Sequence, residues 1–173
     1  MSFLKRIFGE AGQRAALEPL YRAVVATARD PLWYREGRVP DTVEGRFDMV
    51  AAVAAIVLLR LEAEGEAGQT PSVLLTELFV DDMDATLRQI GIGDFVVGKH
   101  VGRMVGALGG RVSALRSGRA EGSLVPAVRR NIFHDAPPDE AAAAAVAERL
   151  ERFASALELR PLQDLLAGEL PEP

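Results

Sequence analysis

Apolar residues recur along most of this chain at the three- and four-residue spacing that is typical of helices with one buried face. Alternating runs of Val, Ile and Thr between tight turns, which would predict strands, do not occur. The spacing predicts helices over residues 11–29, 41–64, 71–90, 94–115, 121–133 and 138–159, and one further turn over 161–167. We therefore predict an all-α fold, a single compact domain of about six helices.

Turn and capping residues mark the limits of these helices. Two segments with Pro and Gly, DPLWYREGRVP at 30–40 and GEAGQTP at 65–71, predict loops. Asp41 is placed to cap the helix that follows it, with Glu44 reaching back to the cap. Pro71 suits the first turn of the next helix.

The most apolar run of the chain is MVAAVAAIVLL, residues 49–59, which ends at Arg60. A helix that spans a bilayer needs about 20 apolar residues. This run is shorter, so it predicts a helix buried in the core of the protein.

Length and composition narrow the class of protein. The chain has 173 residues, enough for one domain with a substantial core, and its hydrophobic share of 49% and charged share of 26% indicate a soluble globular protein. A net charge of −5 argues against general nucleic-acid binding. Without cysteine the chain has no disulfide, no thiolate metal site and no cysteine nucleophile. The first residues, MSFLKRIFGE, lack the apolar core and cleavage site of a signal peptide.

Carboxylates gather on the helix predicted for residues 71–90. Glu77, Asp81 and Asp84 share one face, and Asp82 lies beside them. Carboxylates at this spacing can hold a hard cation, but a di-iron bundle needs Glu-x-x-His pairs, which neither histidine of the chain provides. We interpret the face as a salt-bridged polar surface or a charged docking surface, with a metal-dependent carboxylate enzyme as the alternative.

Glycine recurs at every fourth position of the next predicted helix, at Gly98, Gly102 and Gly106. Each glycine inside a helix costs about 1 kcal/mol relative to alanine, so three cost roughly 3 kcal/mol. Two explanations stay open. Another helix of the same domain packs closely on the ridge, or the ridge is a shallow groove for an apolar helix of a partner, flanked by Lys99 and Arg103.

The N-terminal segment, residues 1–10, predicts a short amphipathic helix. Its apolar and basic residues are Phe3, Leu4, Lys5, Arg6, Ile7 and Phe8. Such a helix can lie in a membrane interface or pack on its own domain. Residues 11–167 are predicted to form the helical domain, and residues 168–173 a flexible tail.

Support for catalysis is slight. No serine lies in a G-x-S-x-G turn, and GIGDFVVGK lacks the spacing and the preceding strand of a phosphate loop. His134 beside Asp135 could form a dyad, but NIFHDAPP is typical of a helix end. We predict a protein that is not an enzyme and has no cofactor.

Three features occur together in a distinctive order. The first is LYRAVVATARDPLWYREGRVPDTVEGRFDMV at 20–50, and the second is its loop, where Trp33-Tyr34 precede Val39-Pro40-Asp41-Thr42. The third is LFVDDMDATLRQIGIGDFVVGKHVGRM at 78–104, an acidic helix, a short turn and a Val-Gly-Lys helix start. Over residues 15–130 the chain resembles the ubiquinol-cytochrome c chaperone family. It departs from the family at GALGGR, where an aromatic residue is expected before Gly-Arg.

The resemblance implies an assembly chaperone of complex III. Mitochondrial members of the family bind newly made cytochrome b, partly near the ribosomal exit, and support its haem acquisition. This chain would be a bacterial counterpart that works without ATP, peripheral on the cytoplasmic face of the inner membrane. The implied partners are cytochrome b, the ribosome, membrane lipids and a second assembly factor.

A chaperone of a membrane protein needs an exposed apolar surface whose backbone a bound helix can approach closely. Acidic side chains would meet the basic cytoplasmic loops of cytochrome b. The residues expected to contact the partner are Trp33, Tyr34, Phe79, Asp81, Asp82, Asp84, Asp94, Gly98, Lys99, Gly102 and Arg103. A helical scaffold or regulator for a soluble partner is the second alternative.

Overall fold

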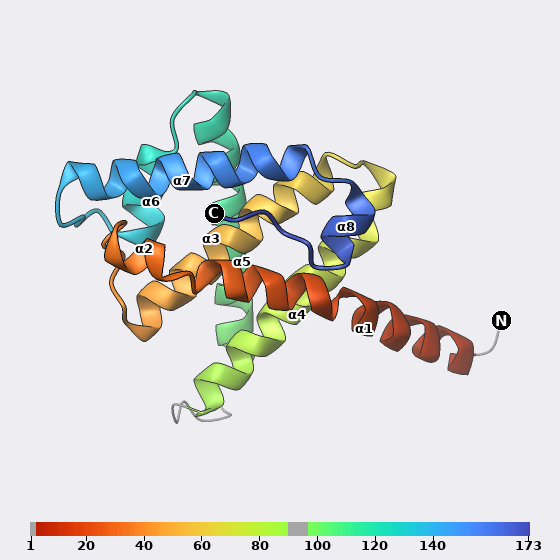
Figure 1. Ribbon diagram of the computed structural model, residues 1–173. Coiled ribbons are helices and arrows are strands. Elements are labelled where there is room, and N and C mark those ends of the chain that lie inside the picture. Colours follow the sequence, from red (N-terminus) through yellow and green to blue (C-terminus); the bar gives the residue numbers. More distant parts are fainter. Residues whose placement is uncertain (1–2, 90–96) are drawn as a thin grey trace.

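The computed structural model describes the backbone of residues 3–89 and 97–173, and the side chains of these residues except 3–11, 87 and 97–101. The described residues form helices joined by turns and loops and contain no strand, which confirms the all-α prediction. The helices are α1 (Phe3–Ala28), α2 (Pro31–Arg35), α3 (Val43–Glu62), α4 (Glu66–Gln89), α5 (Val97–Ala120), α6 (Val125–Ile132), α7 (Glu140–Glu158) and α8 (Leu162–Leu166) (Figure 1). None of these described helices combines the length and hydropathy needed to cross a membrane.

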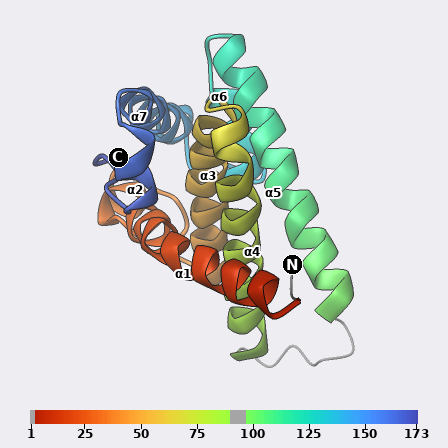
Figure 2. The same ribbon diagram turned by 90° about the vertical axis from the view of Figure 1, so that its right-hand side faces the viewer.

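Helix α3 is the centre of the fold. Every residue from Met49 to Leu58 is buried, as expected for a helix that is apolar on all sides. Helices α1, α4, α5, α6 and α7 all contact it. Figure 2 shows α4 and α5 on one side of α3 and α7 on the other. The apolar run at 49–59 is therefore the core helix that the sequence predicts.

The apolar residues that form one stripe, three or four positions apart, on each of the helices α4, α5 and α7 are buried wherever their side chains are described. They comprise Leu75, Phe79 and Met83 of α4, Met104, Leu108, Val112 and Leu115 of α5, and Val146, Leu150, Phe153 and Leu157 of α7. The helical period alone is thus enough to identify which face of each helix joins the core.

The two predicted loops are shorter than expected. The 30–40 segment contains α2, because Asp30 accepts a hydrogen bond from the backbone N–H of Leu32 (2.8 Å) and caps a helical turn. Most of the 65–71 segment belongs to α4, which begins five residues before Pro71. Gly68 allows this early start, since its backbone lies so close to the end of α3 that no side chain would fit.

The cap of α3 is Thr42, not Asp41. The Thr42 hydroxyl accepts a hydrogen bond from the N–H of Gly45 (3.1 Å), while Asp41 forms an ion pair with Arg46 (2.6 Å). The predicted capping pair of Asp41 and Glu44 is therefore one residue too early.

Helix α1 runs without a break from Phe3, through Pro19, to Ala28. Residues 3–10 of the N-terminal segment are thus the first turns of α1, not a separate helix, and these turns project beyond the other helices in Figure 1. At the other end of the chain, Leu170 packs partly buried against the core. The division into segments 1–10, 11–167 and 168–173 stays a prediction.

Candidate functional site

The acidic residues of α4 contact α1. Asp81 forms an ion pair with Arg14, and the Tyr21 hydroxyl donates a hydrogen bond to Asp82 (2.7 Å). Burial raises the pKa of Tyr21, and the bond to Asp82 raises it further, so the phenol keeps its proton and remains a donor. Asp84 accepts a hydrogen bond from the guanidinium of an arginine one turn further along α4 (2.8 Å). Asp81 and Asp82 therefore help to hold α1 against α4, whereas the contact of Asp84 lies within α4.

The same face offers no cluster of metal ligands. Among the described residues, no three His, Asp or Glu side chains come together in a group that could hold a metal ion. The carboxylates of Asp81, Asp82 and Asp84 point instead to the separate partners above. Each of these carboxylates thus has a hydrogen-bonding partner of its own.

Two aromatic residues that we expected at the surface are core residues. Trp33 and Phe79 are fully buried, so their predicted contact with a partner is wrong for this conformation. The indole N–H of Trp33 donates to the carbonyl of Thr27 (2.7 Å), and the Tyr34 hydroxyl donates to the carbonyl of Ala28 (2.9 Å). The Trp-Tyr pair ties α2 to the end of α1, because each polar tip satisfies a carbonyl at that helix end.

One exposed strip of α5 carries small residues along most of its length. We call this surface the α5 small-residue face; its exposed residues are Gly102, Gly106, Gly109, Gly110, Ser113 and Ser117. Among the described residues, a Cβ atom built on any of the four glycines would meet nothing within 4 Å. The first explanation of the glycine ridge, close packing of another helix of the domain, is therefore wrong for these glycines.

The two sides of α5 differ sharply in character. Met104 and Leu108 are buried against the core. Next to the small-residue face, Val105 is 44% exposed, an uncommon position for a large apolar side chain in this molecule, and Arg103 is exposed as well. Apolar surface, bare backbone and a cation thus occur together on the open side.

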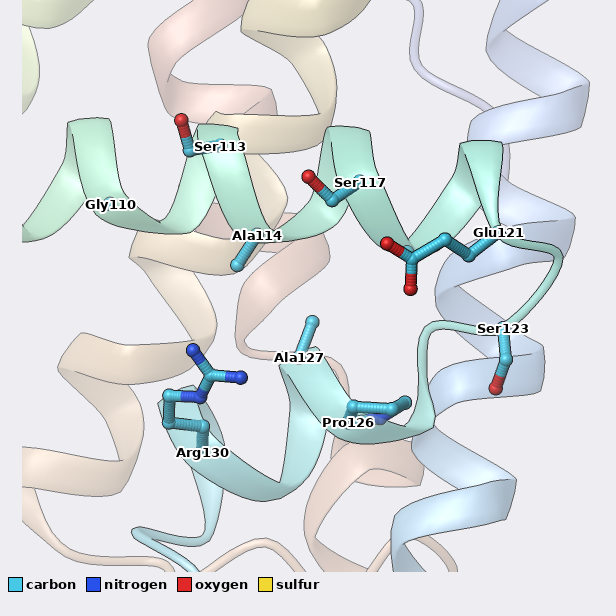
Figure 3. Close-up of a pocket in the computed structure, with 10 residues that line it drawn as sticks. Gly110, Ser113, Ala114, Ser117, Glu121, Ser123, Pro126, Ala127 and Arg130 are labelled. Atoms are coloured by element: carbon cyan, nitrogen blue, oxygen red, sulfur yellow. The ribbon is translucent and has the colours of Figure 1, made fainter.

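The α5 small-residue face leads into a groove between α5 and α6 with a volume of about 310 Å³. Figure 3 shows Ala114 of α5 and Ala127 of α6 pointing toward each other across it. The polar residues that line the groove are Ser113, Ser117, Glu121, Ser123 and Arg130. The groove combines hydroxyl groups, one carboxylate and one guanidinium over a floor of small side chains.

A buried ion pair lies on the opposite side of α5. Asp48 of α3 is 2% exposed and forms an ion pair with Arg111, whose guanidinium also donates to the carbonyl of Asn131 (3.1 Å). The ring nitrogen Nε2 of His134 lies 2.8 Å from the second Asp48 oxygen. Burial raises the pKa of Asp48, and Arg111 and His134 counteract part of this effect. The sequence raised a dyad of His134 with Asp135 without favouring it; in the structure the ring of His134 contacts Asp48.

Comparison with known proteins identifies the family. The family model described as Ubiquinol-cytochrome C chaperone matches residues 35–171, well over half of the chain. This chain belongs to the ubiquinol-cytochrome c chaperone family. The predicted family and its chaperone role in complex III assembly are confirmed.

A solved structure extends the comparison over nearly the whole chaperone. It is described as the Cbp3 homolog from Brucella abortus, with a TM-score of 0.79 and 26% sequence identity over 99% of this chain and 97% of that chain. Among curated proteins no match was found. The family and this structure favour a non-enzymatic protein.

Several expected contact residues of the chaperone fall where the structure gives no side-chain description. Asp94 lies outside the described residues, and Gly98 and Lys99 belong to α5 in a part without described side chains. The same holds for the expected membrane-binding residues of α1, which are Phe3, Leu4, Lys5, Arg6, Ile7 and Phe8. Among the residues expected to contact the partner whose side chains are described, Gly102 and Arg103 lie together on an open surface. Ser113 and Ser117 continue that surface, but they were not among the residues predicted from the sequence.

Proposed function

We propose that this chaperone holds newly made cytochrome b on the α5 small-residue face until the subunit enters ubiquinol-cytochrome c reductase. The observation that carries the proposal is that Gly102, Gly106, Gly109 and Gly110 have open space around them. A helix loses about 1 kcal/mol for each interior glycine, and no contact within the described domain offsets that loss. An external partner that approaches the backbone closely would offset it.

The chemistry of the face suits a membrane helix. Helices in membranes associate through small residues spaced four apart, which let two backbones come close together. Gly102, Gly106 and Gly110 have this spacing, and in the sequence Gly98 extends it by one turn. Val105 would add apolar contact, and Lys99 and Arg103 would flank the bound helix.

Acidic side chains of α4 would provide a second contact. The cytoplasmic loops of membrane proteins are enriched in Lys and Arg. Asp81 is 60% exposed at its side chain although it pairs with Arg14, and Glu77 is exposed too. A basic loop would compete with Arg14 for Asp81, while Asp82 stays bound to Tyr21.

The proposed action is holding, not turnover. Covering an apolar helix needs no ATP, and release follows when the client packs against its own partner subunits. The site of action is the cytoplasmic face of the inner membrane, where the ribosome and a second assembly factor would meet the chaperone.

The docking proposal is tested by filling the α5 small-residue face. Gly106→Leu places a large side chain where a close helix would lie, so recovery of cytochrome b with the tagged chaperone from detergent-solubilised membranes is expected to fall at least roughly tenfold. Ala144→Leu, at an exposed position of α7, is the matched control and should leave recovery unchanged. Equal recovery with both folded variants would contradict docking on this face.

The membrane part of the proposal concerns the first turns of α1, which carry apolar and basic residues and project from the domain. An amphipathic segment of this kind binds weakly to anionic lipid surfaces. Deletion of residues 2–9 is therefore expected to reduce flotation of the chaperone with anionic vesicles. Arg14 stays in the shortened chain, so α1 keeps its ion pair to Asp81. Flotation that is the same for both proteins would rule out this anchor.

A further inference from the structure

The α5 small-residue face changes in polarity along its length. Its first half, from Gly102 to Gly110, presents bare backbone beside the exposed Val105. Its second half presents the hydroxyl groups of Ser113 and Ser117 and opens into the groove against α6. A helix lying along this face would thus meet an apolar surface first and a polar groove at one end.

Most of the polar side chains that line the groove are hydrogen-bond donors. Three serine hydroxyls and the guanidinium of Arg130 can all donate, and Glu121 is the only carboxylate among the lining residues. Both charges are exposed, and within the described part of the chain neither Glu121 nor Arg130 forms an ion pair. Within the described residues, the groove therefore presents hydroxyl donors, one unpaired guanidinium and one unpaired carboxylate to a ligand.

The carboxyl end of a helix has the complementary groups. Its last four carbonyls lack partners within the helix, so they accept hydrogen bonds from outside. These carbonyls also carry the negative end of the helix dipole, which favours a nearby cation such as Arg130. Membrane helices that end on the cytoplasmic side are commonly followed by Lys or Arg, which would meet Glu121.

We propose that the α5–α6 groove receives the carboxyl end of a client membrane helix together with its basic flank. This inference rests on the proposed function, because it takes the α5 small-residue face as the client surface. The serine hydroxyls and Arg130 bind the free carbonyls of the helix end, and Glu121 binds the first Lys or Arg that follows it. The bound helix then runs parallel to α5, with its apolar part on the glycines.

Reversal of the charge at Glu121 tests whether the client helix is followed by Lys or Arg. Glu121→Lys places like charges together, so recovery of cytochrome b is expected to fall at least roughly tenfold, whereas Glu121→Gln, which removes the attraction alone, should lower it less. Glu169→Lys changes an exposed acid far along the chain from the groove and serves as the control. Recovery that is as high with Glu121→Lys as with Glu169→Lys would overturn the inference.

Photo-crosslinking separates this inference from the proposed function. A benzophenone amino acid at position 105 probes the apolar half of the face, and one at position 123 probes the groove. We expect the first to crosslink to an apolar segment of cytochrome b and the second to a basic segment just after a membrane helix. Crosslinks from position 105 with none from 123, or with products from 123 that lie inside a membrane helix, would overturn the groove assignment alone. If neither position yields cytochrome b, the proposed function fails with it.

Discussion

Glycines in two regions of this molecule differ in how closely other atoms surround them. At the ends of α3 the backbone is crowded: a Cβ atom on Gly45 would lie 2.0 Å from the carbonyl oxygen of Pro40, and one on Gly68 would lie 1.8 Å from that of Leu61. On the outer face of α5, a Cβ atom on Gly106 would meet nothing within 4 Å. The fold thus requires the first group and leaves the second unexplained. The difference separates glycines that shape the domain from glycines that are available to a partner.

The largest effect is expected at the crowded glycines. Gly68→Ala should lower the free energy of unfolding by about 3 kcal/mol or more, because the new methyl group must displace the backbone between α3 and α4. Urea denaturation followed by circular dichroism measures the change.

Gly65 offers a matched control three residues earlier. Its φ of +60° favours glycine, but an added Cβ would meet nothing within 4 Å, and asparagine tolerates this backbone conformation. Gly65→Asn should therefore cost much less than Gly68→Ala. Similar losses at both positions would show that crowding is not what distinguishes the glycines of this turn.

The sequence alone was sufficient for the helices and their buried faces. Positions such as Leu75 and Leu108 follow a local period of three and four residues, and that period does not depend on which helix lies opposite. The period does not reveal whether a ridge of small residues packs against the domain or faces outward. Both outcomes suit the spacing of Gly102 and Gly106, so the structure was needed to choose between them.

Buried polar contacts show the same limit. Asp48 directly precedes the most apolar run of the chain, and Arg111 falls on the buried stripe between Leu108 and Leu115, so each could have been recognised as a polar residue in need of a partner. Their pairing depends on how α3 and α5 are aligned, which no local pattern specifies. Trp33 shows the opposite error. The sequence places it in a surface loop, whereas it lies in the short helix α2 and its side chain is fully buried.

The smallest change in stability, and the one of opposite sign, is expected on the open face of α5. Gly106→Ala and Gly109→Ala should each raise the free energy of unfolding by about 1 kcal/mol, because alanine favours the helix and its methyl group enters open space. The same urea titration measures the gain, and the double variant should show roughly the sum if the two sites act independently.

The same double variant also tests the docking face when recovery of cytochrome b is measured together with stability. A methyl group that stabilises the free chaperone also keeps a docked helix farther from the α5 backbone, so the double variant should be more stable and yet recover less cytochrome b than the unaltered chaperone. Higher stability with undiminished recovery would leave the glycines without a role at the docking face. Lower stability would mean that the face is already covered in the free chaperone, and the contrast with Gly45 and Gly68 would then disappear.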